Sequence, residues 1–168
     1  MRVLALDVGG SAVKAASYQN GRIEEQATWL HGYLEMDHAG AGADLAGHIR
    51  AFQRPVWDAA GVAVAGIAST DSRIARSTVL GGLVGLDLAG ILREFGVRTI
   101  AVENDADCGA IAEHASRGQN ISRGIFYVVV GTGIGSAYIM THGELLFRYR
   151  LAPGRAYADE KNPLPNDL

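Results

Sequence analysis

The chain is poor in several residue types, and each shortage excludes a class of protein. Cys108 is the only cysteine, so no intrachain disulfide and no multi-cysteine zinc site can form. The net charge of −3 gives no basic surplus for nucleic acid. The sequence has no apolar run long enough to cross a membrane and no signal-peptide pattern. We therefore expect a cytoplasmic globular protein with no zinc, no nucleic-acid partner and no membrane partner.

Glycine, in contrast, is abundant, and part of its surplus lies in a repeat. The 22 glycines are about 13% of the chain, roughly twice the usual share. Residues 8–21 read VGGSAVKAASYQNG and residues 130–143 read VGTGIGSAYIMTHG, an offset of 122. Each copy predicts a strand, a glycine turn, a second strand and a polar turn ending in glycine. Such turns expose backbone N–H groups to anions, so we expect a nucleotide phosphate between two related lobes.

The order of hydrophobic patterns predicts an α/β fold with a mixed sheet. The first three strands should form an antiparallel meander, and the later ones should enter through helices and lie parallel. A loop is expected at 31–42 and an irregular segment from Tyr149 onward. The predicted strands are 2–8, 12–19, 22–29, 61–68, 99–102, 125–130 and 134–140, and the predicted helices are 43–52, 86–95 and 105–117.

Asp7 ends the first predicted strand, one residue before the glycine turn. A carboxylate beside a phosphate is repulsive unless a cation lies between them, and Mg²⁺, with its oxygen ligands and retained waters, resolves this. The alternative is that Asp7 only caps a turn. Ser11 could donate its hydroxyl to a phosphate or satisfy the turn itself. The five histidines have no ligand spacing and are expected to be mostly solvated.

A second polar group, Glu103-Asn104-Asp105, lies between a predicted strand and a predicted helix. Ligands in open α/β sheets collect at the carboxyl ends of strands. A carboxylate there can accept a proton from an attacking hydroxyl, as phosphoryl transfer requires. The competing interpretation is helix capping by Asn104 or Asp105.

Three segments together resemble the ROK family of bacterial sugar kinases, repressors and open reading frames. They are DVGGSAVKAA, VENDADCGAIAEHASRG and VVVGTGIGSAYIMTHGEL, collinear over about residues 2–147. The resemblance implies the actin/hexokinase/Hsp70 superfamily: a ribonuclease H-like (actin-like ATPase) lobe with a mixed five-stranded sheet flanked by helices, plus a partial second lobe. It implies a first lobe at 1–118, the start of a second lobe at 119–147 and an irregular tail at 148–168.

The resemblance also implies a role for individual residues. Asp105 would be the catalytic base, Asn104 would bind sugar hydroxyls, and Asp7 would hold Mg²⁺ through water. Lys14 matches a family lysine, with no role assigned. The residues implied to bind ATP phosphate are Gly9, Gly10, Ser11, Gly131, Thr132 and Gly133.

The chain departs from the family pattern in three places. Residues 79–83 lack a sugar-contacting amide, residues 152–157 lack a Glu-x-Gly-His segment, and the cysteine-rich zinc motif is absent. Family members are also nearly twice as long. The expected function is phosphoryl transfer from ATP to a hydroxyl of a hexose or N-acylhexosamine. The alternatives are a non-catalytic sugar sensor, which is disfavoured because the chain begins in the first ATPase strand, and an inactive truncated fragment. Exposed apolar strands predict a homo-oligomer, most simply a dimer.

Overall fold

The computed structural model describes residues 1–52, 57–117, 124–131, 134–142 and 145–151. It divides into two compact units, Met1–Asp105 and Ala106–Leu168. The division falls after Asp105, the first residue of helix α3 (Asp105–Arg117), whereas the sequence-based division left this helix with the first lobe. Within the described residues, no helix is both long enough and apolar enough to span a bilayer.

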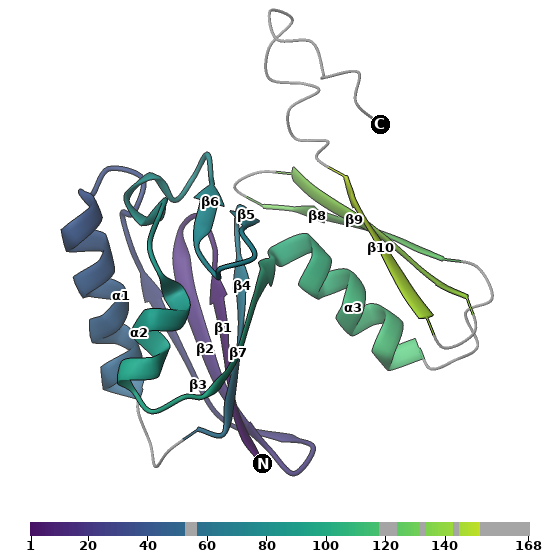
Figure 1. Cartoon of the computed structure of the whole chain (residues 1–168), viewed down its shortest axis with the longest axis horizontal. Helices are drawn as coiled ribbons and strands as arrows, with labels where there is room; N and C mark the ends of the chain where they lie inside the picture. Colours follow the sequence, from purple (N-terminus) through teal and green to yellow (C-terminus); the bar gives the residue numbers. More distant parts are fainter. Residues whose placement is uncertain (53–56, 118–123, 132–133, 143–144, 152–168) are drawn as a thin grey trace, which may run out of the picture. The chain divides into compact units, whose positions relative to one another are not determined.

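The first unit is built on a five-stranded mixed sheet in the order β3-β2-β1-β4-β7 (Figure 1), which confirms the predicted sheet. The antiparallel meander is joined by Asn20-Gly21, both at positive φ, as a tight hairpin turn requires. The next two strands run parallel to the first. The bounds are β1 Arg2–Val8, β2 Ala12–Gln19, β3 Arg22–Leu30, β4 Ala59–Val64 and β7 Thr99–Asn104.

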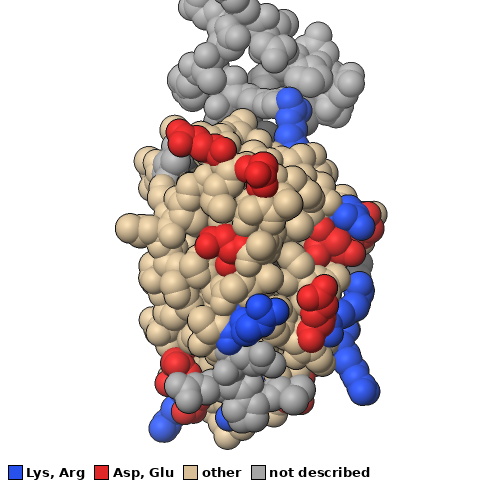
Figure 2. All heavy atoms as spheres, turned by 90° about the vertical axis from the view of Figure 1, so that its left-hand side faces the viewer, with Lys and Arg blue, Asp and Glu red and all other residues tan. Residues whose placement is uncertain are grey.

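One face of this sheet forms the core. Helices α1 (His38–Phe52) and α2 (Leu88–Glu94) cover it (Figure 1), and acidic and basic side chains are interspersed over their outer side (Figure 2). Alternate residues of β1 point into the core, and Leu4, Leu6 and Val8 are buried there. The intervening residues face the other side, which leaves that face available for polar groups.

The predicted loop at 31–42 was wrong in its second half, because α1 begins at His38. Gly40 and Gly42 lower the helical propensity of this turn and concealed it in the sequence. The Asp37 carboxylate accepts the Gly40 N–H at 2.7 Å and so satisfies a donor of the first turn. This contact lets the helix start before its apolar periodicity is visible.

The predicted strand 61–68 is two elements in the structure. Strand β4 ends at Val64, the chain turns at Ala65-Gly66, and β5 (Ile67–Ala68) pairs with β6 (Ile74–Arg76). Gly66 permits the turn because a Cβ there would lie 2.5 Å from the Arg76 carbonyl oxygen. A short 3₁₀ helix, η1 (Gly81–Leu83), then leads to α2, which Asp87 caps through the Gly90 N–H at 2.7 Å.

The second unit contains α3 (Asp105–Arg117) and a three-stranded antiparallel sheet in the order β10-β9-β8. The strands are β8 Ile125–Val130, β9 Ile134–His142 and β10 Leu145–Leu151. The sequence repeat therefore folds as a second meander. Strand β10 extends to Leu151, so residues 148–151 of the expected irregular tail form a strand, and residues 152–168 lie outside the described part of the chain.

The two meanders differ in register by one residue. Val8 pairs with Val13 in the first unit, whereas its repeat equivalent Val130 pairs with Ile134. A one-residue shift turns the side chains of one strand to the opposite face relative to its partner. The repeat therefore preserves the path of the chain but not the set of side chains that share a face.

Candidate functional site

Strand register brings the predicted polar groups together at the carboxyl ends of the parallel strands of the first sheet. Asp7 is paired with Ala63, and Ala63 with Glu103, across the three parallel strands β1, β4 and β7. One residue further, Val8, Val64 and Asn104 are aligned in the same way. Neighbouring strands lie about 4.8 Å apart, so the ends of β1 and β7 are roughly 10 Å apart. The carboxyl ends of parallel strands are where ligands bind in open α/β sheets.

The Asp7 carboxylate is paired with a lysine. Lys14 Nζ donates to Asp7 Oδ2 at 3.0 Å, and the two residues are direct partners in the β1–β2 register. The side chains are 62% and 41% exposed, so the pair contributes little to stability. The Lys14 ammonium balances the Asp7 charge, and both groups face the side of the sheet away from α1 and α2.

Asp7 is a single carboxylate at the carboxyl end of β1. Mg²⁺ often takes only one or two protein carboxylates and keeps several waters. Asp7 offers one such carboxylate beside the glycine turn. Among the described residues, no group of three or more His, Cys, Asp or Glu side chains is arranged to enclose an ion.

The glycine turn after β1 is closed by backbone hydrogen bonds. Gly9 N–H donates to the Ala12 carbonyl at 3.0 Å, so this predicted phosphate donor is engaged inside the turn. A Cβ on Gly9 would lie 3.3 Å from the same oxygen, which is tight contact. The Gly9 carbonyl faces outward from this pair and meets the ring of His31, with Nε2 at 2.9 Å.

His31 is the residue at this turn that sequence reasoning missed. Its backbone N–H donates to the Ser11 carbonyl at 3.2 Å, and its ring stacks on Tyr33 with centroids 3.8 Å apart. The expectation of solvated histidines was also wrong for His48, whose side chain is 19% exposed and whose ring stacks on Trp29. His38 is exposed as expected, although its Nδ1 lies 3.1 Å from the Gly82 carbonyl oxygen. Strand pairing brings His31 there, because the end of the third strand of a meander lies beside the turn between the first two.

At the end of β7, the Asn104 amide makes two hydrogen bonds. Its Nδ2 donates to the Gly66 carbonyl at 2.9 Å and to Asp105 Oδ1 at 3.0 Å. The backbone N–H of Asn104 also donates to Glu103 Oε1 at 3.0 Å. Both amide hydrogens are thus used within the protein, and they tie the Asp105 carboxylate to the turn that follows β4.

The segment that departs from the family pattern is packed into the core. Leu80 and Leu83 are fully buried, and the Gly82 N–H donates to the Tyr33 carbonyl at 2.7 Å. A Cβ on Gly82 would lie 2.6 Å from the Met36 carbonyl oxygen. This stretch therefore contributes packing against residues 33–41, where the family pattern has a sugar-contacting amide.

Of the second predicted phosphate turn, only Gly131 is described, and Thr132 and Gly133 lie outside the described residues. Gly131 is exposed, and a Cβ added to it would meet no atom within 4 Å. The described residues therefore give no steric reason for glycine here, whereas a Cβ on Gly9 would make a tight contact.

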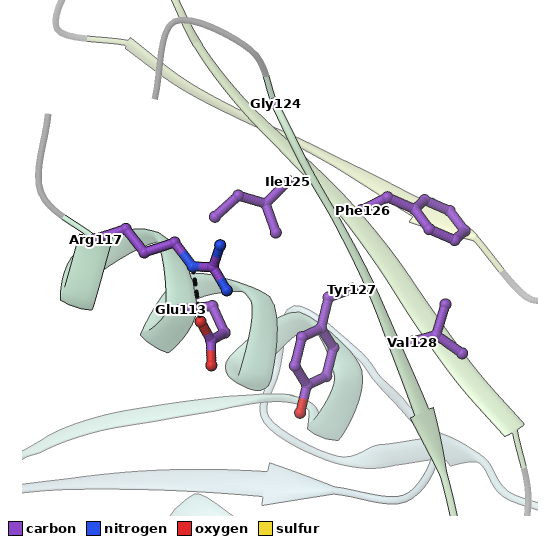
Figure 3. Close-up of a pocket in the computed structure, with 7 residues that line it drawn as sticks. All are labelled: Glu113, Arg117, Gly124, Ile125, Phe126, Tyr127 and Val128. Carbon is purple, nitrogen blue, oxygen red and sulfur yellow. Dashed lines mark hydrogen bonds and ion pairs between the residues drawn. The ribbon is translucent and has the colours of Figure 1, made fainter. Parts of the chain in front are cut away.

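A groove in the second unit runs beside strand β8 (Figure 3). Its lining comprises Glu113 and Arg117 of α3 and residues 124–128. Arg117 Nε and Glu113 Oε2 form an ion pair at 3.0 Å. Ile125 and Tyr127 point toward the helix, whereas Phe126 and Val128 point to the other side of the sheet. None of the predicted catalytic or phosphate-binding residues lines this groove.

Comparison with known proteins identifies the family of the chain. The model of the ROK family matches residues 3–146. The chain belongs to the ROK family. It is 29% identical over 167 residues to an N-acetylmannosamine kinase of Pasteurella multocida (strain Pm70), covering 98% of this chain and 56% of that protein. The ROK chain thus spans about half the length of the curated relatives it matches.

Solved structures confirm the predicted actin-like ATPase fold of this ROK protein. A ROK glucokinase from Streptomyces griseus, in complex with glucose and AMPPNP, matches with a TM-score of 0.70 at 20% identity, covering 89% of this chain and 47% of that one. A ROK transcriptional regulator, a homologue of the E. coli MLC protein, matches with a TM-score of 0.69 at 17% identity, covering 82% and 36%. The fold alone is therefore shared by kinases and regulators, and the site must decide between them.

Proposed function

We propose that this ROK chain carries the catalytic half of an ATP-dependent sugar kinase. The reaction is transfer of the ATP γ-phosphoryl group to a hydroxyl of a hexose or N-acylhexosamine, in the cytoplasm. The observation that carries the proposal is the strand register, which places Asp7 and Glu103-Asn104 at the same carboxyl end of the sheet, with Asp105 following directly after Asn104. A phosphoryl-transfer site needs a base, a carboxylate for the metal and backbone donors for phosphate within one such edge.

In this proposal, the Asp105 carboxylate accepts the proton of the attacking sugar hydroxyl. Asn104 holds Asp105 through the 3.0 Å bond from Nδ2 to Oδ1. Because both of its amide hydrogens are committed within the protein, Asn104 would meet a sugar hydroxyl through its carbonyl oxygen, as an acceptor.

The nucleotide phosphates would lie against the two glycine turns, at Gly9-Gly10-Ser11 and Gly131-Thr132-Gly133. Asp7 would hold Mg²⁺ through water, and Lys14 would remain beside it as a second positive charge. When bound, the metal neutralises charge that develops on the transferred phosphoryl group. The protein supplies the backbone donors and the orientation of the base.

The rival proposals are a non-catalytic sugar sensor and an inactive fragment. The sensor is supported by the fold that this chain shares with a ROK transcriptional regulator. The inactive fragment is supported by the coverage of only about half of the curated relatives. The placement of Asp105 and its support by Asn104 favour the kinase, because a sensor needs sugar contacts but no held base.

The test is ADP release by the purified chain with Mg-ATP and a panel of glucose, N-acetylglucosamine and N-acetylmannosamine. Asp105→Asn is the matched variant, since it keeps the side-chain shape and capping ability while removing the base. Calorimetric sugar titration of both proteins separates binding from chemistry. Sugar binding without ADP release, equal in both proteins, would favour the sensor, and neither binding nor turnover would favour the fragment. An intact-mass measurement and the downstream reading frame show whether further sequence completes the protein.

We also propose that the second unit associates with another copy of the chain. Phe126, Val128 and Val130 are 60%, 49% and 75% exposed, whereas their repeat equivalents Leu4, Leu6 and Val8 are buried under α1 and α2. An apolar sheet face and an open edge favour pairing. Light scattering should detect a dimer or larger species, and Val128→Lys should shift it toward monomer. The control Ile23→Lys, at an exposed apolar position of β3, should have no such effect. A monodisperse wild-type monomer would contradict the proposal.

A further inference from the structure

His31 lies directly after strand β3 and contacts both sides of the first glycine turn. Its ring Nε2 is 2.9 Å from the Gly9 carbonyl oxygen, and its own N–H donates to the Ser11 carbonyl at 3.2 Å. The side chain and the backbone of His31 therefore form hydrogen bonds with two carbonyl groups of the same turn. No motif in the sequence predicted this contact.

The surrounding contacts fix which ring nitrogen of His31 carries the proton. The Tyr33 backbone N–H donates to Nδ1 at 3.2 Å, so Nδ1 must be an acceptor. The Gly9 carbonyl can only accept, so Nε2 must be the donor. Both contacts are satisfied together only by neutral imidazole with its hydrogen on Nε2.

The ring plane is held as well. His31 stacks on Tyr33 with an interplanar angle of 11°, and Tyr33 is fully buried. Burial raises the pKa of the Tyr33 hydroxyl above its ordinary value, and the neighbouring Asp44 carboxylate adds to the shift. Tyr33 is therefore a neutral, buried platform that limits the positions available to the imidazole.

The turn itself has little intrinsic preference for one orientation of the Gly9–Gly10 peptide, because this peptide joins two glycines. Glycine adopts either sign of φ at small cost, so the Gly9–Gly10 peptide can rotate readily. The described residues contain no cis peptide, and a trans peptide directs its C=O and N–H to opposite sides. Holding the Gly9 carbonyl against His31 thus directs the Gly10 N–H away from the ring.

We propose that His31 is a positioning residue of this turn, which holds the Gly9–Gly10 peptide so that the Gly10 N–H is presented to a phosphate oxygen. The inference rests on the proposed function for the identity of the anion as a nucleotide phosphate. It assigns to His31 an effect on phosphate affinity through the orientation of a backbone donor, without direct contact with the nucleotide.

The experiment compares His31→Gln with His31→Asn in the full chain. A Gln amide reaches about as far as Nε2 and keeps a donor for the Gly9 carbonyl. An Asn amide reaches only the Nδ1 position, so it keeps an acceptor for the Tyr33 N–H but loses the Gly9 contact. The readouts are the melting temperature, the ¹H–¹⁵N resonance of the Gly10 amide, the His31 tautomer by long-range ¹H–¹⁵N correlation, and titration with tripolyphosphate and Mg-ATP.

We expect the Nε2–H tautomer in the wild type, a displaced Gly10 resonance in His31→Asn, and about tenfold weaker phosphate binding by that variant. His31→Gln should restore the Gly10 resonance and bind within about threefold of the wild type. A wild-type Nδ1–H tautomer, or Gln and Asn variants with the same Gly10 resonance, would overturn the inference. If the wild type binds neither ligand, the proposed kinase function fails for this chain, while the tautomer and the Gly10 resonance still decide the positioning of the peptide.

Discussion

Replacing Gly82 by alanine should destabilise the first unit markedly, although the change adds a single methyl group. The new Cβ would lie 2.6 Å from the Met36 carbonyl oxygen, 2.9 Å from the Tyr33 carbonyl oxygen and 3.0 Å from the Ala41 Cβ. Two of these atoms belong to the backbone, so no side-chain rotation can relieve the contacts. Overpacking of this kind costs about 1–3 kcal/mol.

Part of that cost is offset, because alanine reduces the conformational entropy of the unfolded chain by about 0.4–1 kcal/mol. Because two of the contacts are with fixed backbone atoms, we expect an overpacking cost near the upper end of that range and a net decrease in the free energy of unfolding of about 2 kcal/mol. For a unit of this size, each kcal/mol shifts the melting temperature by roughly 4–8 °C, so Gly82→Ala should melt about 8–16 °C lower.

The matched control is Gly47→Ala, which lies on the exposed side of α1 with no atom within 4 Å of an added Cβ. Alanine is the better helix former by about 1 kcal/mol, so this variant should melt a few degrees higher. Thermal unfolding followed by tryptophan fluorescence is suitable because Trp29 and Trp57 both belong to the first unit. A Gly82→Ala protein that melts within one or two degrees of the wild type would refute the close approach of residues 33–41 to η1.

Other substitutions test the site. Asp105→Asn should abolish kinase activity in any form of the protein that has it and leave melting unchanged, and turnover by the Asn variant would remove Asp105 from the role of base. Asn104→Asp should lower the melting temperature and raise the pKa of Asp105, because it replaces a donor to Asp105 by a second carboxylate; thermal melts at pH 5 and pH 8 should show the larger loss at pH 8. Gly131→Val should weaken Mg-ATP binding without loss of stability, since an added Cβ there meets no atom within 4 Å. Gly9→Val should weaken Mg-ATP binding and also lower the melting temperature, because its Cβ would lie 3.3 Å from the Ala12 carbonyl oxygen. Calorimetry measures the binding and melting curves measure the stability.

The polar groups at the sheet edge could be predicted from the sequence because their signals are local. Asp7 and Asp105 each adjoin a strand end marked by an apolar run, and a glycine turn or a helix pattern follows within a few residues. The mixed sheet could be predicted for the same reason, since alternating strands and helices restrict the topology. The start of α1 was missed because two glycines lower the helical propensity of its first turn, although Asp37, whose carboxylate accepts the Gly40 N–H three residues later, is a local capping signal.

The function of His31 could not be predicted either. Its partners, Gly9 and Ser11, are 22 and 20 residues away, and the contact exists only because the antiparallel meander returns the end of β3 to the first turn. The same holds for Gly66, which Asn104 reaches across 38 residues of sequence. Hydrogen bonds of this range depend on strand register, which no local pattern records.

The amino-acid sequence by itself determined the repeated hairpin, the family and the identity of the acidic groups, because these depend on residue types at short spacing. The tertiary structure alone decided which face of each repeated hairpin is buried. Val8 and Val130 occupy the same place in the repeat, yet Val8 is buried beneath α1 and α2 and Val130 is 75% exposed. Burial depends on which element covers a strand, and a covering element is supplied by distant parts of the chain.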